Sequence, residues 1–288
     1  MMAHSTESKL RSRVTLRSIP ALRTIPILVY ISILVLFVVF LWMIMPGVLA
    51  PDALAQDLTR SNLPAFTPGH WLGTDSLGRD VLSMVIAGAR SAMIGPLAIA
   101  TGSLIIGLIF GNIAGWYGRW PDRIISSYAD ITLSMPSMLL AIAAAGIIGG
   151  GYWVSVFIMI ILYSPSDIRL IRAAVIQQKS KQYIESALIM RLSSWKIITK
   201  HIFPNISKIV FVNFFLNIAY GLVSMSSLSF LGIGVGPGDA DWGRQLSDGR
   251  RILFTSPAIA LSAGIMIILT AVSINVIGDY VMNRKHSG

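Results

Sequence analysis

Acidic side chains gather at two places where metal binding is worth considering. The first group comprises Asp75, Arg79 and Asp80, with His70 nearby. The second comprises Asp239, Asp241 and Asp248. Two carboxylates and one histidine make a weak ligand set, because metal sites need several converging ligands. We favour a local salt-bridged turn for the first group, interpret the second with the same caution, and predict no metal site.

Other chemistry is also missing from the sequence. There is no cysteine, so no thiolate ligand or nucleophile exists. We find no nucleophile–base arrangement and no histidine pair at metal-ligand spacing. A Gly-Lys pair occurs nowhere, so the chain lacks a Walker loop for ATP. We therefore predict no catalytic residue and no cofactor bound by this chain.

Several polar side chains interrupt or border long apolar stretches: Asn112, Asp130, Asn213, Asn217, Asn275 and Asp279. If these stretches cross a membrane, such groups are rare and often functional. Asn213 and Asn217 are one turn apart and share a helix face. They either line a pathway or join helices by hydrogen bonds, and both readings stay open. For Asp130 we favour a structural ion pair with Arg123.

The elements that would position these residues are membrane helices. Of the 288 residues, 54% are hydrophobic and 12% are charged, against roughly 25% charged in a typical soluble domain. A spanning helix needs about 20 apolar residues. Six stretches qualify: 27–45, 91–117, 124–148, the short 152–163, 206–231 and 257–282. The sequence thus predicts an all-α membrane protein with six transmembrane helices.

The predicted order of segments follows from these spans. It is a tail (1–26), the first helix (27–45), an outer loop (46–90), a five-helix core (91–282) with an inner loop (164–208), and a second tail (283–288). Six spans place both termini on one side. Of the 23 Lys and Arg residues, all but six fall on that side. The six exceptions are Arg60, Arg79, Arg90, Arg244, Arg250 and Arg251.

This asymmetry predicts that both termini are cytoplasmic, because inner segments are enriched in Lys and Arg. It also accounts for the net charge of +10 without nucleic acid. Basic clusters interleaved with aromatic residues, as in nucleic-acid grooves, are absent.

Small residues recur every four positions on two predicted spans. Gly107, Gly111 and Gly115 do so on the second, and Ala141, Ala145 and Gly149 on the third. This spacing lets helix backbones approach closely in lipid. We predict that both helices lie inside a bundle, and that Gly149-Gly150-Gly151 is a tight turn between antiparallel helices.

The inner loop, 164–208, contains eight cationic residues but is helix-prone. Tyr183, Ala187 and Leu188 would share one helix face. Ser193-Ser194 interrupts the pattern and Pro204 closes it. We predict a short helix, a turn and a second short helix, in a loop too long for a simple connector. The loop is expected to dock on a cytoplasmic partner.

Three motifs in the chain match a known family. In the inner loop, Glu185-Ser186-Ala187 precedes Phe203-Pro204. In the outer loop, residues 70–80 read HWLGTDSLGRD and residues 88–91 read GARS. A third motif begins SLSFLGIGVG at Ser227 and ends with DWG at Asp241. The chain from about residue 63 to 279 resembles permeases of ABC importers, specifically the second ("C") subunit of the dipeptide, oligopeptide and nickel class.

The inner-loop motif resembles the EAA loop of that family, with three departures. Ser186 and Phe203 stand where alanine and leucine are usual, while Pro204 keeps its place. Arg191 stands where the family has glycine, six residues after Glu185. Glycine there relieves a turn that needs positive φ. Whether the usual turn geometry survives Arg191 is therefore an open question.

The resemblance implies a type I ABC importer permease fold in the bacterial cytoplasmic membrane. It implies a second, homologous permease as partner, two ATPase subunits that hold ATP and Mg, and an extracytoplasmic solute-binding protein. Glu185 would make a polar contact with an ATPase. The implied solute is a peptide, nickel or a metal chelate, and specificity resides largely in the binding protein.

Three other classes remain as alternatives. A secondary transporter would show internal repeats and midplane ionisable residues. A channel would show a filter or a ring of like charges. An intramembrane enzyme would need a catalytic constellation. The sequence shows none of these features clearly.

Overall fold

The computed structural model describes residues 25–236 and 238–284. Its helices are α1 (Ile25–Ile44), α2 (Pro46–Leu49), η2 (Leu58–Arg60), α3 (Val81–Tyr117), α4 (Arg119–Leu133), α5 (Ser137–Ile148), α6 (Tyr152–Lys179), α7 (Gln182–Ile189), α8 (Ser194–Ile197), η3 (Ile198–Ile202), α9 (Phe203–Phe230), α10 (Trp242–Arg250) and α11 (Pro257–Arg284). The predicted tails, 1–26 and 283–288, lie outside the described residues except where α1 and α11 enter them.

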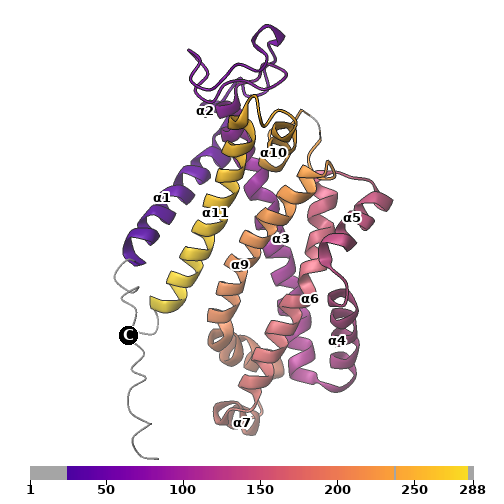
Figure 1. The fold of residues 1–288 in the computed structure, drawn as a ribbon. Coiled ribbons are helices and arrows are strands. Elements are labelled where there is room, and N and C mark those ends of the chain that lie inside the picture. Colours follow the sequence, from indigo (N-terminus) through magenta and orange to yellow (C-terminus); the bar gives the residue numbers. More distant parts are fainter. Residues whose placement is uncertain (1–24, 237, 285–288) are drawn as a thin grey trace, which may run out of the picture.

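The helices confirm an all-α membrane fold. Within the described ranges, five helical stretches are long and apolar enough to cross a membrane, and the bent pair α4 and α5 brings the number to six if it counts as one span. Figure 1 shows α3, α6 and α9 between α1 and α11 on one side and α4 and α5 on the other. Both ends of the described chain point toward the end of the bundle that holds α7, and α10 lies at the opposite end.

The third predicted span, 124–148, is not one straight helix. It is divided into α4 and α5, whose axes differ by 88°. The break lies at Ser134–Pro136, where Ser134 ends α4 and Pro136 precedes α5. Proline lacks an N–H donor and disfavours helical geometry in the residue before it, which explains the break.

The other predicted boundaries are wrong at several helix ends. Helix α3 begins at Val81 rather than at residue 91, because the Asp80 carboxylate accepts a hydrogen bond from the Ser83 N–H (2.8 Å) and caps the helix. Helix α6 continues through Pro165 to Lys179. The inner loop is therefore shorter than 164–208. Pro204 does not end a helix but lies in the first turn of α9.

The three glycines of α3 lie against α6. A Cβ atom added at Gly107 would lie 2.5 Å from the Asp167 Cβ, and one at Gly111 2.8 Å from the Ile171 Cβ. At Gly115 it would lie 2.8 Å from the Val175 Cβ. The contacts advance together along both helices, so α3 and α6 run parallel. The backbones of α3 and α6 approach this closely because the three glycines of α3 have no side chains.

The glycine turn between α5 and α6 lies at the α10 end of the bundle. Gly149 and Gly151 have φ of +102° and +145°, values that a side chain would strain. The Gly151 N–H donates to the Ile233 carbonyl (2.9 Å). The turn is thereby attached to the segment that follows α9.

Candidate functional site

The loop between α6 and α9 rests on an apolar cluster. Ile184 and Ala187 of α7 are buried in it, as are Ile197 and Ile202 of the following helical turns. Buried residues of α3, α6 and α9 complete the cluster: Trp116, Ile171, Ala174, Val175, Ile206 and Val210. Of the three residues predicted to share a face, Ala187 is buried, whereas Tyr183 and Leu188 are 38% and 48% exposed. The loop is thus packed firmly against the bundle.

The turn after α7 keeps the geometry that glycine would favour, although Arg191 occupies it. Arg191 has φ +56°. Its N–H donates to the Leu188 carbonyl (2.9 Å), and the Leu192 N–H donates to the Ala187 carbonyl (3.2 Å). These two bonds form a Schellman motif, with Leu192 packed on the same apolar cluster as Ala187. The departure from glycine therefore adds strain without changing the turn.

Arg191→Gly is expected to stabilise the loop. A left-handed conformation costs an L-residue about 1–2 kcal/mol, and this cost disappears with glycine. Glycine, however, loses more conformational entropy on folding, which lowers the stability by about 0.5–1 kcal/mol. The net gain in stability is therefore about 0–1.5 kcal/mol. Hydrogen exchange at the residue 191 and Leu192 amides should slow accordingly. Arg191→Ala is the control, since it removes the guanidinium but keeps the strain; equal slowing in both variants would contradict the backbone explanation.

The outward surface of this loop carries large apolar side chains, the acidic Glu185 and the exposed cations Lys181, Arg191, Lys196 and Lys200. Ile189 is 82% exposed, Met190 64% and Trp195 76%. Glu185 lies exposed on α7, and no described side chain forms an ion pair with it. An exposed apolar patch of this kind marks an interaction surface. We call Glu185, Ile189, Met190 and Trp195 the loop surface.

The remaining predicted loop residues lie beside this surface. The Ser186 hydroxyl donates back to the Gln182 carbonyl (3.1 Å). Phe203, 39% exposed, borders a groove that Trp195 also lines, and Pro204 is exposed. Partial burial raises the pKa of Tyr183, so its phenol remains a donor, to Gln178 Oε1 at 2.6 Å.

Asn213 and Asn217 join helices through a residue that the sequence prediction missed. Both amides donate to the carboxylate of Asp167 on α6, with Asn217 Nδ2 at 2.8 Å from Oδ1 and 3.1 Å from Oδ2. The Ser103 hydroxyl of α3 lies beside this carboxylate and donates to the Ala100 carbonyl (3.4 Å). Asp167 is fully buried. We call Ser103, Asp167, Asn213 and Asn217 the polar layer.

Two ion pairs connect α4 to α6. Arg172 contacts both carboxylate oxygens of Asp122, with Nη2 at 2.7 Å from Oδ2. Asp130 pairs with Arg169 and not with Arg123, so the predicted partner was wrong, although the structural role of Asp130 stands. Arg169 lies one turn before Arg172 along α6, whereas Asp130 follows Asp122 along α4; the two helices are therefore antiparallel.

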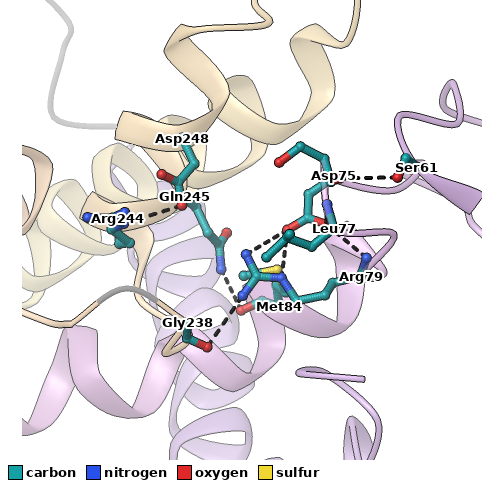
Figure 2. Close-up of polar contacts among 10 residues, drawn as sticks. Ser61, Asp75, Leu77, Arg79, Met84, Gly238, Arg244, Gln245 and Asp248 are labelled. Atoms are coloured by element: carbon teal, nitrogen blue, oxygen red, sulfur yellow. Dashed lines mark hydrogen bonds and ion pairs between the residues drawn. The ribbon is translucent and has the colours of Figure 1, made fainter. Parts of the chain in front are cut away.

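At the α10 end, the outer acidic groups form structural contacts (Figure 2). Asp75 accepts from Arg79 Nε at 2.7 Å and pairs with Nη2 at 2.6 Å, and it also accepts from the Leu77 and Arg79 N–H groups. Arg79 reaches the Gly238 carbonyl (3.3 Å), and Gln245 donates to the Met84 carbonyl (2.7 Å). This confirms a salt-bridged turn and ties it to distant segments of the chain.

The second acidic group also makes structural contacts. Asp241 caps α10 by accepting from the Arg244 N–H (3.0 Å), and it accepts from the Ser91 hydroxyl. Burial raises the pKa of its carboxyl, and these hydrogen bonds partly offset that effect. Asp248 pairs with Arg244 at 3.3 Å. In the part of the chain that is described, no three His, Asp or Glu side chains gather as metal ligands.

These features define a multi-pass membrane protein whose bundle carries a helical loop with exposed apolar side chains at one end. Residues 103–286 match the family model described as the binding-protein-dependent transport system inner membrane component. The chain belongs to this family, the permease subunits of ABC importers.

Curated relatives and solved structures agree with this assignment. The glutathione transport system permease protein GsiD of Pectobacterium atrosepticum is 36% identical over 73% of this chain and 70% of its own length. The dipeptide transport system permease protein DppC of Alkalihalophilus pseudofirmus is 35% identical, over 82% and 78%. The fold matches a chain of the inward-facing MetNI methionine ABC transporter, with TM-score 0.58 and 14% identity over 70% of this chain and 96% of that one.

Proposed function

We propose that this permease imports small peptides across the bacterial inner membrane. The names of the relatives, a glutathione and a dipeptide permease, support a peptide over nickel or a metal chelate. The chain would form half of the translocation pathway together with a second, homologous permease. An extracytoplasmic solute-binding protein would deliver the peptide.

In this proposal, two separate ATPase subunits hold ATP and Mg, and one of them docks on the loop surface. The observation that carries it is the exposed apolar patch around Glu185, held on a rigid apolar base. The α7 end of the bundle is then cytoplasmic, as are both termini. Most Lys and Arg residues lie toward that end in the sequence-predicted topology, which supports this orientation.

The test is transport by the purified complex in proteoliposomes. Glutathione and a dipeptide should accumulate only with ATP and the solute-binding protein, and nickel ions should not. Uptake without ATP would leave a secondary transporter or channel as the explanation. Uptake of nickel in place of peptide would retain the importer and reject the proposed solute.

Glu185→Arg is expected to weaken ATPase association at least about tenfold, because it reverses the charge of the exposed acidic residue of the loop surface. The exposed side chain has no described ion-pair partner to lose, so membrane insertion and bundle stability should not change. Co-purification of the ATPase subunits at increasing salt concentration measures the effect.

Asp52→Arg is the matched control, since Asp52 is an exposed acidic residue at the α10 end. It makes the same change in net charge and should leave association as in the wild type. If Glu185→Arg also leaves association and uptake unchanged, Glu185 does not lie in the docking surface.

A further inference from the structure

The polar layer separates two apolar clusters inside the bundle. Toward the α7 end lies the cluster that holds the loop, and toward the α10 end lies a second cluster. The second contains Ile99 of α3, Val156, Ile158 and Met159 of α6, and Met225 and Leu228 of α9. Each of these three helices passes from one cluster to the other through the layer. The layer is therefore a boundary between two packed halves.

A carboxylate is not needed to fill this position. Asp167 is fully buried, and no described Lys, Arg or His lies at ion-pair distance from it. A buried charge without a cation is costly, and apolar residues of similar size often stabilise a core at least as well. Intramembrane acidic groups are for this reason candidates for function. The geometry of Asp167 indicates which function.

The carboxylate fixes α6 to α9 at the base of the loop. The chain between Asp167 and Asn213 comprises the lower part of α6, the loop itself and the start of α9. From Asp167 to Lys179 helix α6 extends about 18 Å, and α9 extends about 15 Å from Phe203 to Asn213. Both limbs pack with the loop in one cluster. A push on the loop surface is therefore transmitted to the layer as movement of one body.

Helix α6 has a weak point next to this layer. Pro165, two residues before Asp167, has no N–H for the Ile161 carbonyl. That carbonyl instead accepts from the Ser164 hydroxyl (2.9 Å) and from the Tyr128 hydroxyl of α4 (3.0 Å). Such a site is where a helix bends. The hydrogen bonds of the polar layer lie on one side of Pro165, and the second cluster lies on the other.

We propose that Asp167 is a positioning residue for transport, one that locks α6 to α9 so that movement of the loop turns the α10 half of the bundle about Pro165. The proposal rests on the importer function proposed above. Without the hydrogen bonds between Asp167 and α9, the ATPases would still dock and hydrolyse ATP. Their movement would then bend α6 at Pro165 and would not turn the α10 half of the bundle.

The test compares peptide uptake with ATP hydrolysis in the reconstituted complex. Asp167→Asn should keep ATP hydrolysis within about twofold of wild type, while uptake per ATP falls about tenfold, the size expected when charge-assisted hydrogen bonds are lost. The double variant Asp167→Asn/Asn213→Asp returns a carboxylate to the layer on α9. It should restore uptake per ATP to within about threefold, whereas a purely structural defect would lower uptake and hydrolysis together.

Controls make each outcome decisive. Asn275→Ala changes an asparagine of α11 that lies outside the layer and should leave the ratio unchanged. If Asp167→Asn does not fold, Asn213→Ala removes one donor from a half-buried position and should still lower the ratio. The proposal is overturned if Asp167→Asn leaves uptake per ATP unchanged. It is also overturned if uptake and ATP hydrolysis fall together and the double variant does not restore them. A wild-type complex that shows no ATP-dependent uptake instead refutes the importer function itself.

Discussion

Replacing Gly111 with leucine should abolish the folded bundle. The first added carbon atom already meets the Ile171 Cβ at 2.8 Å and the Ile168 carbonyl oxygen at 3.0 Å. A backbone atom cannot move aside as a side chain does, so α3 and α6 must separate. Overpacking costs about 1–3 kcal/mol where the core can adapt, and we expect at least the upper value here. Folded yield and a monodisperse gel-filtration peak should both be lost.

Gly146→Leu is the control for this prediction. Gly146 lies on α5, also within a helix, and an added Cβ there meets nothing within 4 Å. Its folded yield should equal that of the wild type. If Gly111→Leu behaves like Gly146→Leu, the close approach of α3 and α6 is not needed for the fold.

Arg79→Met should strongly destabilise the α10 end. The Arg79 and Asp75 side chains are only 5% and 7% exposed. Removing the guanidinium leaves the carboxylate buried with backbone donors alone. Breaking a buried pair in this way costs about 3–5 kcal/mol. Thermal unfolding in detergent should begin at a clearly lower temperature, and protease should cleave the segment between α2 and α3 sooner.

The double variant Asp75→Asn/Arg79→Met separates charge from packing. In the wild-type structure the Leu77 and Arg79 N–H groups donate to Asp75 Oδ1 at 2.9 and 2.8 Å. The amide oxygen of the asparagine at position 75 in the double variant can still accept both hydrogen bonds. No charge is then buried, so stability should return to within about 1 kcal/mol of wild type. Equal loss in the single and double variants would mean that the contact of Arg79 with Gly238, rather than the ion pair, holds this end.

The sequence predicted the helices better than their ends. Apolar length located each span, but it could not distinguish the effects of Pro96, Pro136 and Pro165 on their helices. Pro96 and Pro165 lie within continuous helices, whereas Pro136 accompanies a bend of 88°. The local rule is the same for all three. Packing of α3 and α6 against their neighbours decides which helix stays continuous, and that information is not local.

The polar layer contains a residue that the sequence analysis does not single out. The predicted fourth span ends at residue 163, so Asp167 falls in the predicted inner loop, 164–208. In the structure Asp167 lies within α6 and is fully buried. Asn213 and Asn217 were the available signal, since two amides on one face inside lipid require an acceptor on another helix. The turn after α7 was easier to predict, because it differs from the family pattern only in having Arg191, rather than glycine, at the left-handed position.

The contacts at the α10 end also set an order of assembly. Residues 79, 84 and 85 make their hydrogen bonds with Gly238, Gln245 and Trp242, more than 100 positions later in the chain. During synthesis the N-terminal segments emerge first. The segment before α3 can therefore form its own ion pair early in synthesis. Its hydrogen bonds with Gly238, Trp242 and Gln245 can form only after α9 has inserted in the membrane and α10 has been synthesised. A chain truncated before that point would present an open end that proteases can recognise.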